Sequence, residues 1–86
     1  MKKVVFLDHA LFQMKRRGIS EKDVRRVIQK PGQMEEVRPG RLVFQSQIMV
    51  GEPARTFLLR VFVDVGKSSF EIVTVYRTRK IEKYWR

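Results

Sequence analysis

The sequence contains no cysteine and a single histidine, His9. Without cysteine the chain can form no disulfide, no thiolate zinc site and no cysteine nucleophile. A zinc site needs three or four ligands, and one histidine with nine scattered acidic residues does not supply them. We therefore expect no metal and no other cofactor.

Long hydrophobic runs are also missing. The longest apolar run, residues 4–7, has four members, whereas a membrane-spanning helix needs about 20. The N-terminal segment reaches Asp8 too early for a secretory signal peptide, whose apolar stretch has about 7–15 residues. We therefore expect a cytoplasmic protein with no membrane partner.

The 86 residues are 43% hydrophobic and 33% charged, as in a folded domain rather than a disordered chain. A chain of this length buries roughly 64% of its unfolded surface, which is enough for one hydrophobic core. We expect a single domain spanning residues 1–86.

The formal net charge is +10, and the positive excess lies at the two ends of the chain. Residues 1–31 carry +6, residues 32–76 are neutral, and residues 77–86 carry +4. Such segregation indicates a negatively charged partner rather than general solubility. Nucleic acid is the first candidate, and an acidic protein or a membrane surface is the alternative that charge alone leaves open.

The hydrophobic periodicity changes along the chain from helical to strand-like. Asp8 is expected to cap a first helix that ends at Gly18, and Ser20 to cap a second that ends at Pro31-Gly32. A period of two then predicts strands, and a short basic helix closes the chain. The expected strands are residues 3–7, 33–38, 41–50, 56–65 and 69–77, with the closing helix in residues 78–86. The fold class is α+β, with a short N-terminal strand and two helices packed on a twisted antiparallel sheet of about four strands.

Two short motifs point to chemistry that their surroundings do not support. Gly66-Lys67-Ser68 matches the end of a phosphate-binding P-loop, but position 61, where that motif needs glycine, is valine. Glu35 and Glu36 are adjacent in a strand, so their side chains point to opposite faces and cannot share a substrate atom. We expect a hairpin turn at the first motif and no paired-carboxylate site at the second.

The histidine, the basic residues and the aromatic residues of this sequence suit RNA cleavage without a metal. That reaction needs a base for the ribose 2′-hydroxyl, an acid for the leaving oxygen and cations for the phosphate charge. His9 suits acid–base chemistry because histidine titrates near neutral pH, although it can equally be an exposed histidine without a role. The arginines of the two helices can hold phosphates or simply form a solvated face. Basic and aromatic residues alternate near the C-terminus, where they can bind RNA or dock a helix.

Three segments resemble a bacterial and archaeal domain of unknown function that is placed with the RelE/ParE-like toxins and with metal-independent ribonucleases such as barnase and colicin-type nuclease domains. The segments are His9-Ala10-x-x-x-Met14-x-x-Arg17-Gly18-Ile19-Ser20, Gln29-Lys30-Pro31-Gly32 and Ile72-Val73-Thr74-Val75-Tyr76-Arg77-Thr78-x-Lys80. The ending Arg79-Lys80-x-Glu82-Lys83-Tyr84 is similar to that of BrnT-type toxins. Many relatives carry arginine where this chain has Gln13.

This resemblance implies a RelE/barnase-like fold, RNA cleavage by 2′-oxygen attack, and two partners, RNA (free or on the ribosome) and an acidic antitoxin protein. No small-molecule ligand is expected. The residues expected to be catalytic are His9, Thr74, Tyr76 and Lys80. Those expected to hold nucleic acid are Arg16, Arg17, Arg60, Arg77 and Arg79. The alternatives are a nucleic-acid-binding domain that does not cleave and an antitoxin-binding domain.

The last strand leaves one question open. If Phe70, Ile72, Thr74 and Tyr76 share one face throughout, Thr74 and Tyr76 lie against the helices. If the strand changes face near its end, both lie on the open side of the sheet.

Overall fold

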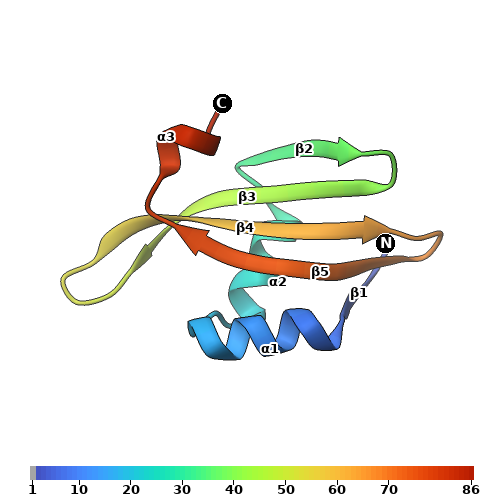
Figure 1. The fold of residues 1–86 in the computed structure, drawn as a ribbon, viewed down its shortest axis with the longest axis horizontal. Coiled ribbons are helices and arrows are strands. Elements are labelled where there is room, and N and C mark those ends of the chain that lie inside the picture. Colours follow the sequence, from blue (N-terminus) through green and yellow to red (C-terminus); the bar gives the residue numbers. More distant parts are fainter. Residues whose placement is uncertain (1) are drawn as a thin grey trace.

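A computed structural model describes residues 2–86. Eight elements follow one another along the chain (Figure 1). They are β1 (Lys3–Phe6), α1 (Asp8–Arg17), α2 (Glu21–Gln29), β2 (Gln33–Arg38), β3 (Arg41–Val50), β4 (Arg55–Val65), β5 (Ser69–Thr78) and α3 (Ile81–Tyr84). The α+β class is confirmed, and the strands lie close to the predicted ranges. None of the helices in residues 2–86 is long and apolar enough to cross a bilayer.

The five strands form one sheet in the order β1-β5-β4-β3-β2. The four long strands are antiparallel to their neighbours, as predicted, but β1 pairs parallel with β5, from Lys3 opposite Ser69 to Phe6 opposite Ile72. The prediction of an antiparallel sheet of about four strands was therefore incomplete, because the sheet is mixed and has a fifth strand. Parallel pairing joins segments that are far apart in sequence, so local pattern could not place β1.

The two long helices differ in how their ends are capped. Ser20 caps α2 as predicted, with its hydroxyl accepting the Asp23 N–H at 3.1 Å. Gly18 ends α1 in the left-handed conformation, at φ 66°. The predicted cap at Asp8 was wrong: Leu7 holds the N-cap position, and Asp8 lies in the first turn without a side-chain cap bond. Its negative charge there still interacts favourably with the positive N-terminal end of the helix dipole.

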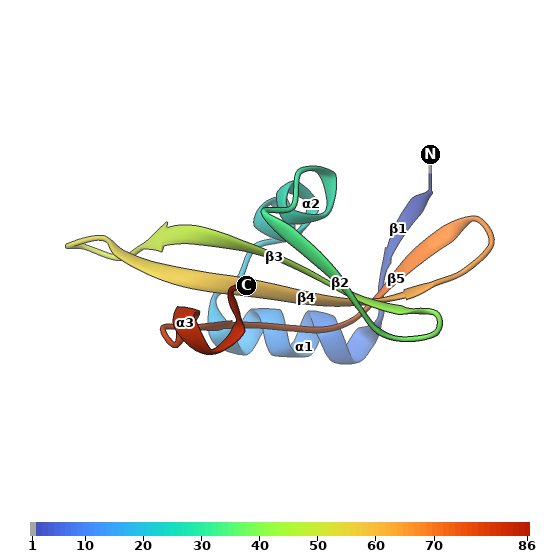
Figure 2. The same ribbon diagram turned by 90° about the horizontal axis from the view of Figure 1, so that it is seen from above.

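The helices lie on different sides of the sheet. Figure 2 shows α2 over one face and α3 over the other, while Figure 1 shows α1 running beside β5. The main core lies between the sheet and the first two helices. Its buried members include Ala10, Met14, Val24, Val27, Phe44, Leu59, Val61, Val63, Ile72 and Val75. We refer to the face towards α2 as the covered face and to the opposite one as the open face.

A β-bulge at Val73 settles the open question about the last strand. Ile72 pairs with Val63 and Thr74 pairs with Phe62, so Val73 is an extra residue between two consecutive pairs. Beyond the bulge the alternation is inverted. Val75 takes the core position with no exposed surface, and Thr74 and Tyr76 turn to the open face.

Candidate functional site

The open face carries one polar row that crosses four strands. Each pair of neighbours in this row lies directly opposite in the sheet register. Its members are Gln33 (β2), Gln45 (β3), Arg60 (β4) and Tyr76 (β5). Directly opposite residues of an antiparallel pair lie within side-chain reach, so the register alone brings these four groups together.

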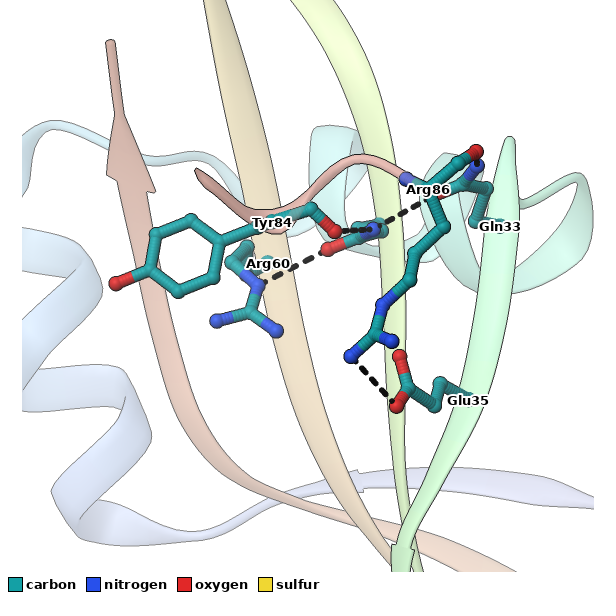
Figure 3. A network of polar contacts seen from close by, with 6 residues as sticks. Gln33, Glu35, Arg60, Tyr84 and Arg86 are labelled. Atoms are coloured by element: carbon teal, nitrogen blue, oxygen red, sulfur yellow. Dashed lines mark hydrogen bonds and ion pairs between the residues drawn. The ribbon is translucent and has the colours of Figure 1, made fainter. Parts of the chain in front are cut away.

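Arg60 lies at the centre of this row. Its Nε donates to Gln45 Oε1 at 3.0 Å, and its Nη1 donates to the Tyr76 hydroxyl at 2.6 Å. Aromatic rings lie against the guanidinium, whose carbon is 4.1 Å from the ring centroid of Tyr84 (Figure 3) and 5.2 Å from that of Phe62. A guanidinium held this way keeps its charge while much of its hydration is replaced by ring faces.

Gln45 holds Arg60 in place. Only 3% of its surface is exposed, and its Nε2 donates to Gln33 Oε1 at 2.8 Å and to the Tyr84 carbonyl at 3.1 Å. With Oε1 accepting from Arg60, every polar atom of this buried amide has a partner. Sequence reasoning missed Gln45. The available signal was a polar residue on the open side of a strand, and its partners depend on register.

The C-terminal segment folds over the row. Gln33 exchanges two hydrogen bonds with the backbone of Arg86, and the Arg86 guanidinium pairs with Glu35 at 3.0 Å (Figure 3). The Trp85 ring packs on Gly32, where a Cβ would lie only 2.8 Å from Cη2. The C-terminal aromatic residues thus dock the short helix, one of the two roles left open by the sequence, and this docking places the Tyr84 ring over Arg60.

The two tyrosine hydroxyls have opposite pKa shifts. Burial raises the pKa of Tyr76 above its ordinary value, against the opposing effect of the Arg60 hydrogen bond. Interaction with the Tyr76 hydroxyl lowers the pKa of Tyr84, and the charge of Lys83 acts in the same direction. The raised pKa keeps Tyr76 protonated at neutral pH, so its hydroxyl can donate a hydrogen bond while it accepts one from the Arg60 guanidinium.

His9 lies on α1, away from the polar row. Its Nε2 is 3.0 Å from the Nε2 of Gln13, and the Oε1 of Gln13 accepts the Val75 N–H at 3.2 Å. Because Oε1 accepts the hydrogen bond from that N–H, it is the Nε2 of Gln13 that faces His9, and this nitrogen donates the hydrogen bond between the two side chains. In this contact the Nε2 of the imidazole is the acceptor. Arg17 donates to the Val75 carbonyl at 2.8 Å, so two side chains of α1 bond the backbone of β5.

The other predicted residues fall into two groups. Thr74 lies next to Tyr76 on the open face, opposite Phe62. The remaining four are spread over α1, the end of β5 and the turn that follows it. They are Arg16, whose guanidinium lies over the Phe12 ring; Arg77, which donates to the Gly18 carbonyl; and Arg79 and Lys80, which line a shallow hollow beside α3.

The structure thus brings together Arg60, Tyr76 and Thr74 and leaves His9 apart from them. It also joins the two basic ends of the chain, because the bond from Arg77 to the Gly18 carbonyl links the end of β5 to the end of α1. Among residues 2–86 no three acidic or histidine side chains gather as metal ligands.

Replacing Gln45 with methionine tests whether its amide organises the row. Gln45→Met keeps the side-chain length but leaves the Arg60 Nε and the Tyr84 carbonyl without their partner. We expect the free energy of unfolding in urea to fall by about 1–3 kcal/mol. Gln47→Met, on an exposed position of the same strand, is the matched control and should change it by less than about 0.5 kcal/mol. Equal effects of the two substitutions would contradict the assignment.

Absorbance titration of the two tyrosines tests their coupling. We expect two steps, one on each side of the ordinary value near pH 10. Tyr76→Phe should remove the later step and move the Tyr84 step upwards. Because the folded pKa of Tyr76 is raised, the stability linked to its neutral form is complete below the unfolded value and is lost as pH rises through the folded one. A single step in the unmodified protein would rule out the coupling.

Comparison with known families adds one match. No curated protein and no solved structure matches the chain. Residues 6–77 match the family described as "Domain of unknown function (DUF4258)", a range that includes the whole polar row and excludes α3. On this match, which covers most of its length, the chain belongs to the DUF4258 family.

Proposed function

We propose that this protein is a metal-independent endoribonuclease of the RelE/ParE-like toxin type, and that RNA binds on the open face around Arg60. The observation that carries the proposal is the 2.6 Å hydrogen bond from Arg60 Nη1 to the Tyr76 hydroxyl. It places a fixed cation beside a proton donor, and both residues were expected from the sequence to take part in RNA cleavage.

The chemistry assigns one task to each group. The ribose 2′-oxygen attacks the adjacent phosphorus, the bond from phosphorus to the 5′-oxygen breaks, and a 2′,3′-cyclic phosphate remains. Arg60 stabilises the added charge on the phosphoryl oxygens. Tyr76, kept protonated by its raised pKa, gives its proton to the departing 5′-oxygen and regains one from water.

His9 lies on α1, apart from Arg60 and Tyr76, so this proposal requires RNA binding to bring α1 and the scissile phosphate together. His9 is then the base, and it takes the 2′-hydroxyl proton on Nε2. That nitrogen is bonded to Gln13 in the structure, so the bond must open when RNA binds. Aromatic rings next to Arg60 support the binding of unpaired bases, because Phe62 and Tyr76 are stacked with centroids 6.2 Å apart. An acidic antitoxin remains the expected protein partner of such a toxin.

The test is RNA cleavage in EDTA, followed by identification of the product ends. We expect 2′,3′-cyclic phosphate ends, and a loss of about 10²–10⁴-fold in rate for Tyr76→Phe, because general acid catalysis contributes roughly that factor. His9→Ala should cause a similar loss. Arg55→Ala, which removes a cation from an exposed position outside the row, should leave the rate unchanged. Full activity in Tyr76→Phe would remove the proposed acid, and full activity in His9→Ala would remove only the proposed base.

A second candidate is an RNA-binding domain that does not cleave. It is supported by the separation of His9 from the row and by the Gln13 bond that occupies its Nε2. This function predicts tight RNA binding without products and a steep salt dependence. Each phosphate contact contributes roughly 0.7 to the slope of log K against log salt on single strands, so Arg60→Gln should reduce the slope by about that amount. Absence of any RNA complex at about 0.1 M salt would contradict both candidates and leave the protein-binding alternative.

A further inference from the structure

A separate surface lies on the covered face, between β1, α2 and the start of β5. It is a hollow of about 690 Å³. Its lining divides into a basic rim and an apolar floor. The rim has Lys2, Lys3 and Arg25, and the floor has Val4, Ile28 and Phe70.

The basic rim continues along α2. Arg25 and Gln29 also line an adjoining hollow, together with Lys22 and Arg26. None of the described residues that line these two hollows is acidic. Glu21 approaches Arg25 only to 4.0 Å, and about half of each side chain stays exposed, so the pair neutralises little of the rim. Four exposed cations, Lys3, Lys22, Arg25 and Arg26, therefore lie with the half-buried Lys2 around the apolar depression.

The floor is suited to an aliphatic or aromatic side chain rather than to a nucleobase. Val4 and Phe70 are half-buried and pack against the main core, which fixes their positions. The Lys2 ammonium lies 5.8 Å from the Phe70 ring centroid and donates to the Gly66 and Lys67 carbonyls. Because the ammonium lies over this ring, less of the ring face is left for a base to stack on.

We infer that this hollow is the docking site for an acidic amphipathic segment of a partner protein. Charge complementarity carries the inference: an apolar side chain of the partner enters the floor, and carboxylates on either side of it meet the rim. A surface that bound only phosphates would not need the apolar floor. The site goes beyond the proposed nuclease function and lies on the opposite face of the sheet from Arg60, so either can fail without the other.

A designed peptide tests this site. The probe is a synthetic helix-forming peptide of glutamate and leucine, with leucines at i, i+3, i+4 and i+7 so that they form one face. In amide NMR spectra of the full chain we expect its binding to shift the signals of Val4, Ile28 and Phe70. Lys3→Glu/Arg25→Glu should weaken binding by about tenfold, because each exposed ion pair contributes up to about 1 kcal/mol. Lys15→Glu/Arg55→Glu makes the same change in net charge on exposed positions elsewhere and should leave affinity within about twofold.

Four results would overturn the inference. They are equal weakening by the two double variants, equal binding of a peptide with the same residues in shuffled order, shifts at the floor caused by a single-stranded RNA oligonucleotide instead of the peptide, and concentration-dependent dimerisation through the same residues. RNA cleavage measured on Lys3→Glu/Arg25→Glu separates the two proposals, since that variant leaves the polar row intact. Its unfolding curve in urea confirms that any loss of peptide binding does not come from loss of the fold.

Discussion

The extra residue in β5 determines which groups the open face presents. Ile72 and Val75 both reach the core, although their spacing of three does not fit a regular strand. The bulge at Val73 absorbs the mismatch, and burial of two aliphatic side chains favours it over a regular pairing that would place Thr74 in the core. With Tyr76 turned to the open face, Arg60 gains its hydroxyl partner. The polar row therefore depends on a packing requirement on the other side of the sheet.

Much of the fold could be predicted because its signals are local. The helix caps at Gly18 and Ser20 and the alternation in β3 and β4 are determined by residues that are neighbours in the sequence. They therefore predict bounds close to the observed ones. The parallel pairing of β1 and the bulge at Val73 depend on contacts between distant segments. The hydrophobic pattern of one segment predicts neither the parallel pairing nor the bulge. The sequence therefore did not determine which face of the sheet carries Tyr76.

The candidate site was predicted only in part for the same reason. Arg60 and Tyr76 stood out as a cation and a phenol, and the structure joins them. Gln45 was not predicted as a site residue, because nothing distinguishes a glutamine in a strand until the register shows which side chains lie opposite it. His9 and Arg17 were assigned to the site by residue type and resemblance. In the structure they lie on α1, whose side chains form hydrogen bonds with the backbone at the edge of β5. Residue type indicates what a side chain can do, and register determines which others it can act with.

The bonds from α1 to Val75 have a consequence for solubility. Beyond its pairing with β1, strand β5 would present unpaired backbone groups, and such an edge invites a strand from another molecule. Gln13 and Arg17 occupy the N–H and carbonyl of Val75, so an incoming strand finds that position already bonded. The other edge, β2, carries Glu35, which is paired with Arg86, and Glu36, whose exposed charge opposes pairing with a second copy of the same strand. Side chains therefore bond one position on the exposed edge of β5 and a charge lies on the edge of β2, and both features oppose edge-to-edge association of the sheet.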